Sequence, residues 1–535
     1  MIKKIKYNKK FILMVAVIIL IAAAFLMALL KGEAALSSPE RVLKWKLVLD
    51  KVRTDDINGF FRELPEYYMA NNEHETELQR EALAAIFALS DEIPNMTDKE
   101  IANRLSEIVS RAKSGGSAEC IGWTRGMAIL SFHLEEYFDK FYDIDNNSAD
   151  FELYKELFGE IDSLSADVPN LSDLEIKIRI QYILAKLGDS HTYTSLLTAD
   201  GINKVYPFFA NSYEDGLWVV GVYREKYKEA INCKILEINN IPIDEIFERI
   251  RGFVGHEHVN FVKSRYGNYI AYPEVLFAVN IIENIEDEII LTLEGLDGNI
   301  KAVAFYEKIQ MAERLDAFDA TFITDRADGD KAFFASRNEG IWAEYIEYGK
   351  ILFIRLNTFS KYEGKWEMDP ELDPFDDIKE ISSKHKIEKI VLDYRGNTGG
   401  WVRLDYPWQD LVIELAQEIP LFLALNWNSY SAAPNQALYF KNNTNAITIG
   451  LPPGSGLLGR MDPMEVEIPD RNFSITFSAS NYHEDYAADL EQILNGTKIE
   501  DYGDNTIHPD IQIVIGILDY INKSDPVLEW IVRIE

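Results

Sequence analysis

EKIVLDYRGNTGG, residues 388–400, is the most informative stretch of this chain for its fold. Its first half is a short apolar run, which is typical of a strand buried on both faces of a parallel sheet. Its second half holds Gly396, Gly399 and Gly400, which let a backbone turn sharply and bring its N–H groups close to a ligand. Such N–H groups can form an oxyanion hole. A tight connection from strand to helix explains the same turn equally well.

The sequence around this stretch alternates between strands and helices. Apolar runs predict strands, and apolar residues at three- and four-residue spacing predict helices. The predicted strands are 349–359, 388–393, 419–427 and 445–450, and the predicted helices are 377–385, 411–417 and 431–443. This order indicates a largely parallel sheet covered by helices, in which functional residues gather where strands end.

Two other regions precede this α/β part. Residues 34 to about 200 have the periodicity of helices. Within them, 88–117 resembles 163–192, and in both segments Ser or Thr is expected to cap a helix after Pro-Asn, which fits either a degenerate repeat or a chance similarity of two helix starts. Residues 201–305 read as a β-rich module with strands at 216–223, 233–243 and 287–299 and a helix at 244–254. The chain of 535 residues is therefore expected to be an α+β protein of several domains.

The N-terminus carries a separate signal. Residues 11–30 are twenty consecutive apolar residues, long enough to span a bilayer as a helix, and five lysines precede them. This pattern predicts a single-pass signal anchor in the cell membrane, with residues 1–10 in the cytoplasm and the rest of the chain outside. A cleaved signal peptide, favoured by Ala34 and Ala35, is the alternative, and both interpretations export the bulk of the chain.

The composition argues against some classes of function. With 54 basic and 88 acidic residues the net charge is −34, which repels nucleic acid and anionic lipid. Two cysteines, Cys120 and Cys233, cannot form a disulfide framework. His256-Glu257-His258 offers metal ligands, but a further ligand is not visible in the sequence. We therefore interpret this segment as a solvated loop and expect no metal or organic cofactor.

Two residues of the chain, a serine and a histidine, are candidates for hydrolytic chemistry. Ser431, in LNWNSYSAAPNQA, falls between a predicted strand and a predicted helix, where a serine serves as an N-cap or as a nucleophile. His191, in LGDSHTYT, follows a helical stretch, and its neighbours Asp189, Ser190 and Thr192 are typical capping residues. Neither position alone distinguishes a structural role from a catalytic one.

Taken in order, GDSHT, D-x-R-x-N-x-G-G, YSAA and IHPDI resemble the S41 peptidase family, which includes the carboxy-terminal processing proteases and the tricorn core proteases. The resemblance covers about residues 120–535 and is strongest in LDYRGNTGG, in SYSAAPNQALYFKNNTNAITIG and near the C-terminus. After a helical domain (34–118), it implies a helical part with the catalytic histidine (119–200), a PDZ-like module (201–305) and an α/β core of the ClpP/crotonase type (306–535).

The resemblance also implies a set of site residues. The Ser–Lys dyad of the processing proteases is absent, because no lysine occurs from Asn442 to Thr497, where the family places it. The tricorn-like members use a Ser–His pair, which matches Ser431 as nucleophile and His191 as general base. The other implied residues are Ser190 as a supporting group, Gly399 or Gly400 with Ala432 as N–H donors to the oxyanion, and Glu500 as the third catalytic group, with Asp501 and Glu484 as rivals.

The expected function is that of an exported, membrane-anchored serine peptidase that cleaves peptides or proteins through an acyl-enzyme, and a homo-oligomer is left open. Two departures from the family keep an alternative open. Pro434 stands where the family often has an acidic residue, and the turn after the next strand reads Leu451-Pro452-Pro453-Gly454. The alternative is a catalytically inactive protein that uses the same fold to bind a peptide or a lipophilic ligand.

Overall fold

The computed structural model describes residues 118–141, 149–316, 340–359, 373–400, 404–468, 471–481 and 487–534. The chain divides into two compact units, Met1–Ile129 and Leu130–Glu535, with the boundary inside helix α6 (Ala118–Phe141). The features described below belong to the second unit. Across the described segments, no helix is both long enough and apolar enough to cross a bilayer. The predicted anchor (11–30) and the first copy of the predicted repeat lie outside the described residues.

A six-stranded sheet forms the α/β part of the second unit, with the order β10-β11-β12-β13-β14-β17. Its first pair is antiparallel and the others are parallel. Four of the strands were predicted within a few residues of their bounds, and β10 and β17 lie at the two edges. The bounds are β10 Ile341–Ile346, β11 Ile351–Leu356, β12 Lys389–Asp393, β13 Leu421–Leu425, β14 Ile447–Gly450 and β17 Ile511–Gln512.

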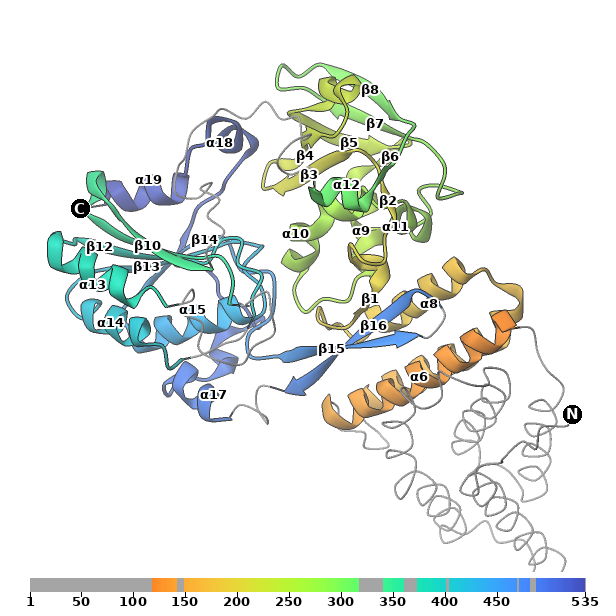
Figure 1. Cartoon of the computed structure of the whole chain (residues 1–535), viewed down its shortest axis with the longest axis horizontal. Helices are drawn as coiled ribbons and strands as arrows, with labels where there is room; N and C mark the ends of the chain where they lie inside the picture. Colours follow the sequence, from red (N-terminus) through yellow and green to blue (C-terminus); the bar gives the residue numbers. More distant parts are fainter. Residues whose placement is uncertain are drawn as a thin grey trace, which may run out of the picture. The chain divides into compact units, whose positions relative to one another are not determined.

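Helices cover both faces of this sheet (Figure 1). Alternate side chains of a strand point to opposite faces. In β11, Leu352 and Ile354 therefore pack with Trp408 and Phe440 on one face, whereas Phe353 packs with Leu528 and Ile531 on the other. The first face is covered by α13 (Phe375–Lys384), α14 (Pro407–Leu415), α15 (Ala432–Asn443) and α17 (Ala487–Leu494), and the second by α19 (Pro526–Arg533).

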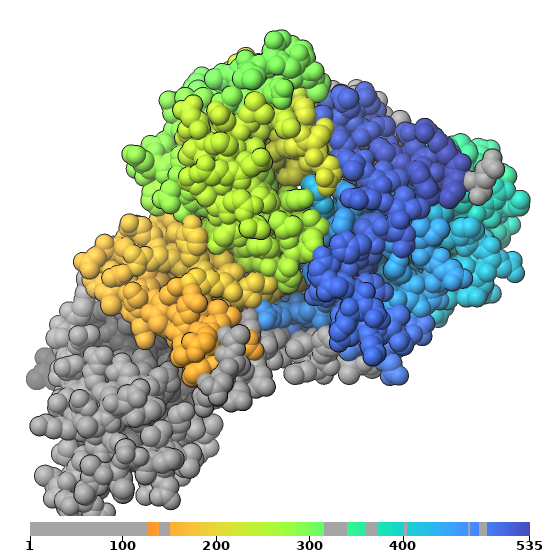
Figure 2. Space-filling view, turned by 180° about the vertical axis from the view of Figure 1, so that it is seen from behind, coloured from red at the N-terminus to blue at the C-terminus, as the bar shows by residue number. Residues whose placement is uncertain are grey.

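The predicted β-rich region is an antiparallel sheet with helices around it. The strands are β3 Phe208–Tyr213, β4 Gly216–Val222, β5 Cys233–Ile238, β6 Ile241–Pro242, β7 Ile289–Glu294 and β8 Ile300–Phe305, and the helices are α9 Ile243–Phe253, α10 Val259–Tyr269 and α11 Pro273–Ala278. Trp218 and Val220 of β4 pack on Ile517 of α18 (Ile517–Asn522), so this region touches the C-terminal segment (Figure 2). Its PDZ-like character stays a prediction.

Helix α10 was not predicted, because its sequence is rich in aromatic and β-branched residues that favour strands. Tertiary packing explains the helix. A Cβ atom added to Gly267 would lie 1.9 Å from the Ala210 carbonyl oxygen, so α10 lies directly against the backbone of β3. A glycine in the middle of a helix costs about 1 kcal/mol relative to alanine, and here it permits this close approach.

The histidine-bearing segment follows two helices, α7 (Ala149–Asp167) and α8 (Asp173–Ala185). Ser172 caps α8 as predicted: its hydroxyl accepts the Glu175 N–H, and the Glu175 carboxylate accepts the Ser172 N–H in return. After α8 the chain passes His191 and forms the short strand β1 (Tyr193–Thr194).

An unpredicted hairpin connects this segment to the α/β core. Strands β15 (Arg460–Ile468) and β16 (Phe473–Asn481) pair with each other, and β16 also pairs with β1, where Thr194 lies opposite Ile475. Figure 1 shows the hairpin extending away from the six-stranded sheet. Residues of the predicted domains 119–200 and 306–535 therefore share one sheet, which fixes the histidine loop relative to the core.

Candidate active site

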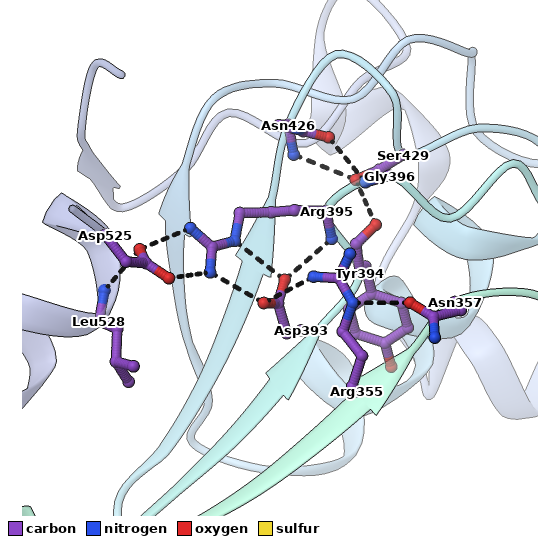
Figure 3. A network of polar contacts seen from close by, with 10 residues as sticks. All are labelled: Arg355, Asn357, Asp393, Tyr394, Arg395, Gly396, Asn426, Ser429, Asp525 and Leu528. Carbon is purple, nitrogen blue, oxygen red and sulfur yellow. Dashed lines mark hydrogen bonds and ion pairs between the residues drawn. The ribbon is translucent and has the colours of Figure 1, made fainter. Parts of the chain in front are cut away.

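The two turns singled out in the sequence are bonded to each other at the carboxyl ends of β12 and β13 (Figure 3). The Gly396 N–H donates to Asn426 Oδ1 (3.1 Å), and the Ser429 hydroxyl donates to the Tyr394 carbonyl (2.9 Å). The Tyr430 N–H donates to the carbonyl of Asn397 (2.9 Å). From the sequence, each turn alone fitted a structural role as well as a functional one. Together the two turns form one platform that holds Ser431.

A buried ion network supports this platform from below (Figure 3). The Arg395 guanidinium donates to both carboxylate oxygens of Asp393 (2.9 and 2.8 Å) and to both of Asp525 (2.8 and 2.7 Å). Arg355 Nη1 lies 2.8 Å from Asp393 Oδ2, and Asp525 also accepts the Leu528 N–H at the start of α19. Burial alone would raise the pKa of Asp393, but the two guanidiniums hold that pKa below its usual value.

Ser431 has an unusual backbone conformation. Its φ of 58° and ψ of −112° lie in a region that residues with a Cβ rarely adopt. The Ser431 N–H donates to Ser455 Oγ (2.8 Å), which helps to hold this conformation. Ser431 occupies the N-cap position of α15, but its side chain makes no capping hydrogen bond. The hydroxyl is therefore not used as a helix cap, although the sequence allowed that role for Ser431.

The Ser431 hydroxyl faces His191 instead. Oγ of Ser431 and Nε2 of His191 lie 3.0 Å apart, within hydrogen-bond distance. The imidazole is 6% exposed and stacks on the Tyr430 ring, with centroids 4.8 Å apart. Burial lowers the pKa of His191, and the positive charge of Arg265 also lowers it, against the opposing charge of Asp189. The imidazole is therefore neutral at neutral pH and able to accept a proton.

Asp189 is the carboxylate nearest to His191. Its Oδ1 accepts the His191 backbone N–H (3.0 Å) and lies 4.0 Å from Nδ1. Its Oδ2 accepts the hydroxyls of Tyr137 (2.8 Å), Thr192 (2.6 Å) and Ser478 (2.8 Å). Burial alone would raise the pKa of Asp189, but the charge that His191 carries when its ring is protonated and the Thr192 hydrogen bond hold the pKa of Asp189 below its usual value. A buried anion thus lies beside the imidazole, at a residue that the sequence suggested as a cap.

The structure does not bring Glu500 to the pair. Glu500 is exposed in the 3-10 turn Ile499–Tyr502, and it makes no hydrogen bond to His191 or Ser431 in the described part of the chain. Its rival Asp501 lies in the same exposed turn, and the other rival, Glu484, lies outside the described residues. The acidic group beside the imidazole is Asp189, from the same loop as the histidine.

Ser190 lies next to the pair and contacts two residues that the sequence did not assign to the site. Its hydroxyl is 3.1 Å from the Tyr430 hydroxyl, and its backbone N–H donates to Glu257 Oε1 (3.2 Å). Glu257 is exposed as a residue, but its carboxylate points inward at Ser190. Enclosure of this carboxylate and the negative charge of Asp189 raise the pKa of Glu257 to about 7.

Gly399 and Gly400, the two candidate oxyanion donors, differ in their surroundings. The Gly399 N–H donates to Asn397 Oδ1 (2.8 Å), so it is already used. For the Gly400 N–H, no acceptor is found among the described residues. Ala432 begins α15, where helix N–H groups have no partner in their own helix. Gly400 and Ala432 are therefore the better candidates, and Gly399 has a steric role.

That steric role gives a prediction for Gly399→Ala. A Cβ at Gly399, whose φ is 98°, would lie 2.6 Å from Ser431 Cβ and 2.8 Å from the Tyr430 carbonyl oxygen. We expect the substitution to displace Ser431 and to slow its reaction with a fluorophosphonate at least about 100-fold, because small misplacements of a reacting group cost that much. Gly298→Ala is the matched control, since Gly298 also has a positive φ (79°) but nothing within 4 Å. Equal labelling rates in both variants would contradict the prediction.

Comparisons with known proteins find distant structural similarities. No family model and no curated protein matches the sequence. Among solved structures, mature CPAF aligns with a TM-score of 0.48 and 13% identity, over 78% of this chain and 96% of that one. The photosystem II D1 C-terminal processing protease (TM-score 0.32, 11% identity, 78% and 97% covered) and the tricorn protease (0.32, 11%, 76% and 36%) also align. The similarity to these three structures is one of fold, at 13% identity or less.

Proposed function

We propose that this protein is a serine peptidase in which Ser431 is the nucleophile and His191 the general base. The observation that carries the proposal is the 3.0 Å approach of Ser431 Oγ to His191 Nε2, two residues 240 positions apart in the chain. A serine hydroxyl is a poor nucleophile until a base takes its proton. A buried, neutral imidazole at this distance is such a base, and the free Ser431 hydroxyl has no capping role to compete with the reaction.

The surrounding groups support an acyl-transfer mechanism. Ser431 Oγ attacks the carbonyl carbon of the peptide while its proton passes to His191 Nε2, and that proton then goes to the leaving amine. The N–H groups of Gly400 and Ala432 stabilise the negative charge on the carbonyl oxygen. Water hydrolyses the acyl-enzyme by the same route in reverse. Tyr430 holds the imidazole by stacking, and the nearby negative charge of Asp189 stabilises the imidazolium as it forms.

Peptide hydrolysis tests this proposal directly. Incubation of the wild-type chain with a mixture of unstructured peptides is expected to give new N-termini, detected by mass spectrometry, whereas Ser431→Ala gives none. Equal cleavage by the two proteins would overturn the proposal. Binding of peptides without cleavage by the folded wild type would favour the inactive binding protein instead.

The pKa of His191 predicts the pH dependence of the reaction. The base must be neutral, and burial lowers its pKa below the ordinary 6.5. The rate of labelling by a fluorophosphonate should therefore fall with acidification at a lower pH than expected for an ordinary imidazole. Asp189 and Asp462 act against this shift by raising the pKa of His191, and Arg265 reinforces it.

Arg265→Gln provides a directional check of this prediction. The Arg265 guanidinium lies over the rings of Phe261 and Tyr430, at 3.9 and 4.7 Å from their centroids. Its removal should raise the pKa of His191 and move the acid limb of the profile to higher pH. Lys263→Gln is the matched control, because Lys263 stacks on Trp427 instead. If the acid limb of the pH profile did not move in Arg265→Gln, or moved equally in Lys263→Gln, the assignment of this limb to His191 would be refuted.

We also propose that residues 11–30 anchor the peptidase in the cell membrane with its catalytic part outside. This part of the proposal rests on the apolar run and the five preceding lysines alone. Alkaline extraction of cells that express the full chain tests it. The chain should stay in the membrane pellet, and a deletion of residues 1–33 should release it. A full-length chain in the supernatant would rule out the anchor.

A further inference from the structure

Three metal-ligating side chains lie close together, and one of them is the His191 imidazole. A ligand atom from each of Asp189, His191 and Glu257 lies within 4.8 Å of the other two. Nδ1 of His191 is buried and has no hydrogen-bond partner in the described chain, although the opposite nitrogen faces Ser431. A buried polar nitrogen without a partner is unusual, since such groups cost free energy unless they are satisfied.

The ligand set favours one class of ion. An imidazole nitrogen with two carboxylates suits Zn²⁺, which takes three protein ligands and leaves a fourth position open. At metal–ligand distances of about 2.1 Å, tetrahedral ligand atoms lie about 3.4 Å apart. The 4.0 Å separation of Nδ1 and Asp189 Oδ1 is close to that value, so a small side-chain rotation would bring these two atoms to the spacing of metal ligands.

The neighbouring groups also suit a metal site. The carboxylate of Asp189 is oriented by the hydroxyls of Tyr137, Thr192 and Ser478, which is the outer support that metal-bound carboxylates require. We propose that Asp189, His191 and Glu257 bind Zn²⁺, and that the bound ion inhibits the peptidase.

Inhibition follows from the chemistry of imidazole, and this step rests on the proposed function. A neutral imidazole carries one proton, and Zn²⁺ on Nδ1 leaves that proton on Nε2. Nε2 then donates to Ser431 Oγ and has no lone pair to accept the Ser431 proton. The ion thus holds the histidine in the tautomer that cannot act as a base, and its removal restores the active tautomer. No covalent bond of the protein changes.

Metal binding is measured first, because it does not depend on activity. Calorimetric titration of the full chain carrying Ser431→Ala with ZnCl₂ should show one site, and adding Glu257→Gln should weaken it at least about tenfold. Glutamine can still accept the Ser190 N–H, and circular dichroism confirms folding, with Glu257→Ala as a second variant. His508→Asn is the control, because His508 is exposed and pairs with Asp504 rather than with a residue of the proposed site. Zinc binding that survives in both Glu257 variants, or that is lost with His508→Asn, would overturn the proposal.

Inhibition is measured second, by fluorophosphonate labelling of the wild-type chain with and without ZnCl₂. Labelling should be suppressed by Zn²⁺, unaffected by Mg²⁺ and restored by a chelator, and Glu257→Gln should need at least about tenfold more Zn²⁺ for the same suppression. Labelling that is insensitive to Zn²⁺ at concentrations that saturate the calorimetric site would refute the inhibitory role. A chain that binds Zn²⁺ but never reacts in metal-free buffer would refute the proposed function and leave the metal site standing.

Discussion

A chain with His191→Gln is expected to lose at least about 10⁴-fold of its rate of peptide hydrolysis, because removal of the base of a serine hydrolase costs that much or more. Glutamine is similar in size and polarity, but it cannot take the proton of Ser431. The loss should appear in kcat, since the base acts in the transition state, and the KM should change little. Steady-state kinetics on any peptide that the wild type cleaves would measure both quantities.

His256→Gln is the matched control for this prediction. His256 precedes Glu257 in the chain, and its Nδ1 contacts the Val254 carbonyl (2.7 Å) rather than a nucleophile. We expect this variant to keep most of the wild-type rate. A similar loss in both variants would point to damaged folding, and full activity of His191→Gln would remove His191 from the mechanism.

Arg395→Ala should be among the most destabilising substitutions in the α/β core. It leaves Asp393 and Asp525 buried without one of their counter-charges, and both side chains are almost fully enclosed. Breaking a buried ion pair by removing one partner costs about 3–5 kcal/mol of unfolding free energy. Urea unfolding followed by tryptophan fluorescence measures this loss. At urea concentrations below the unfolding midpoint, Ser431 should also be labelled more slowly in this variant than in the wild type, because Arg395 holds the turn that packs against Ser431.

The exposed ion pair on α19 supplies the comparison. Arg533 pairs with Glu529 at 3.2 Å, but its side chain is 77% exposed. Water already screens this pair, so Arg533→Ala should change the unfolding free energy by less than about 1 kcal/mol. If Arg395→Ala cost no more than Arg533→Ala, the buried network would not be what holds the platform.

The α/β core was predictable from the sequence because its strands are buried on both faces. A strand such as β13 then reads as an uninterrupted apolar run, and helix α15 follows it with a clear change of period. The hairpin β15–β16 gave no such signal. Strand β15 carries acidic residues and Pro463, and β16 alternates apolar and polar residues. Both strands are stabilised by pairing with each other, and β16 also pairs with β1, which lies far away in the sequence.

The residues of the candidate site also divide into those that the sequence pointed to and those that it did not. Ser431 and His191 were identified through a resemblance of short motifs, because no local pattern connects residues 240 positions apart. The partners of the imidazole were not predictable. Asp189 has the sequence context of a helix cap, and Glu257 that of a surface loop. Glu257 comes close to His191 through the packing of the histidine loop against the segment between α9 and α10. The proximity of Asp189 to His191 in the sequence was the one available signal.

The most direct test of the proposed mechanism is to map the site of fluorophosphonate labelling on the wild-type chain by mass spectrometry. The proposed mechanism predicts a single labelled residue, Ser431, and loss of the label in His191→Gln while circular dichroism shows intact folding. A label on Ser190 or Ser429, or no label on a folded and metal-free wild type, would contradict it.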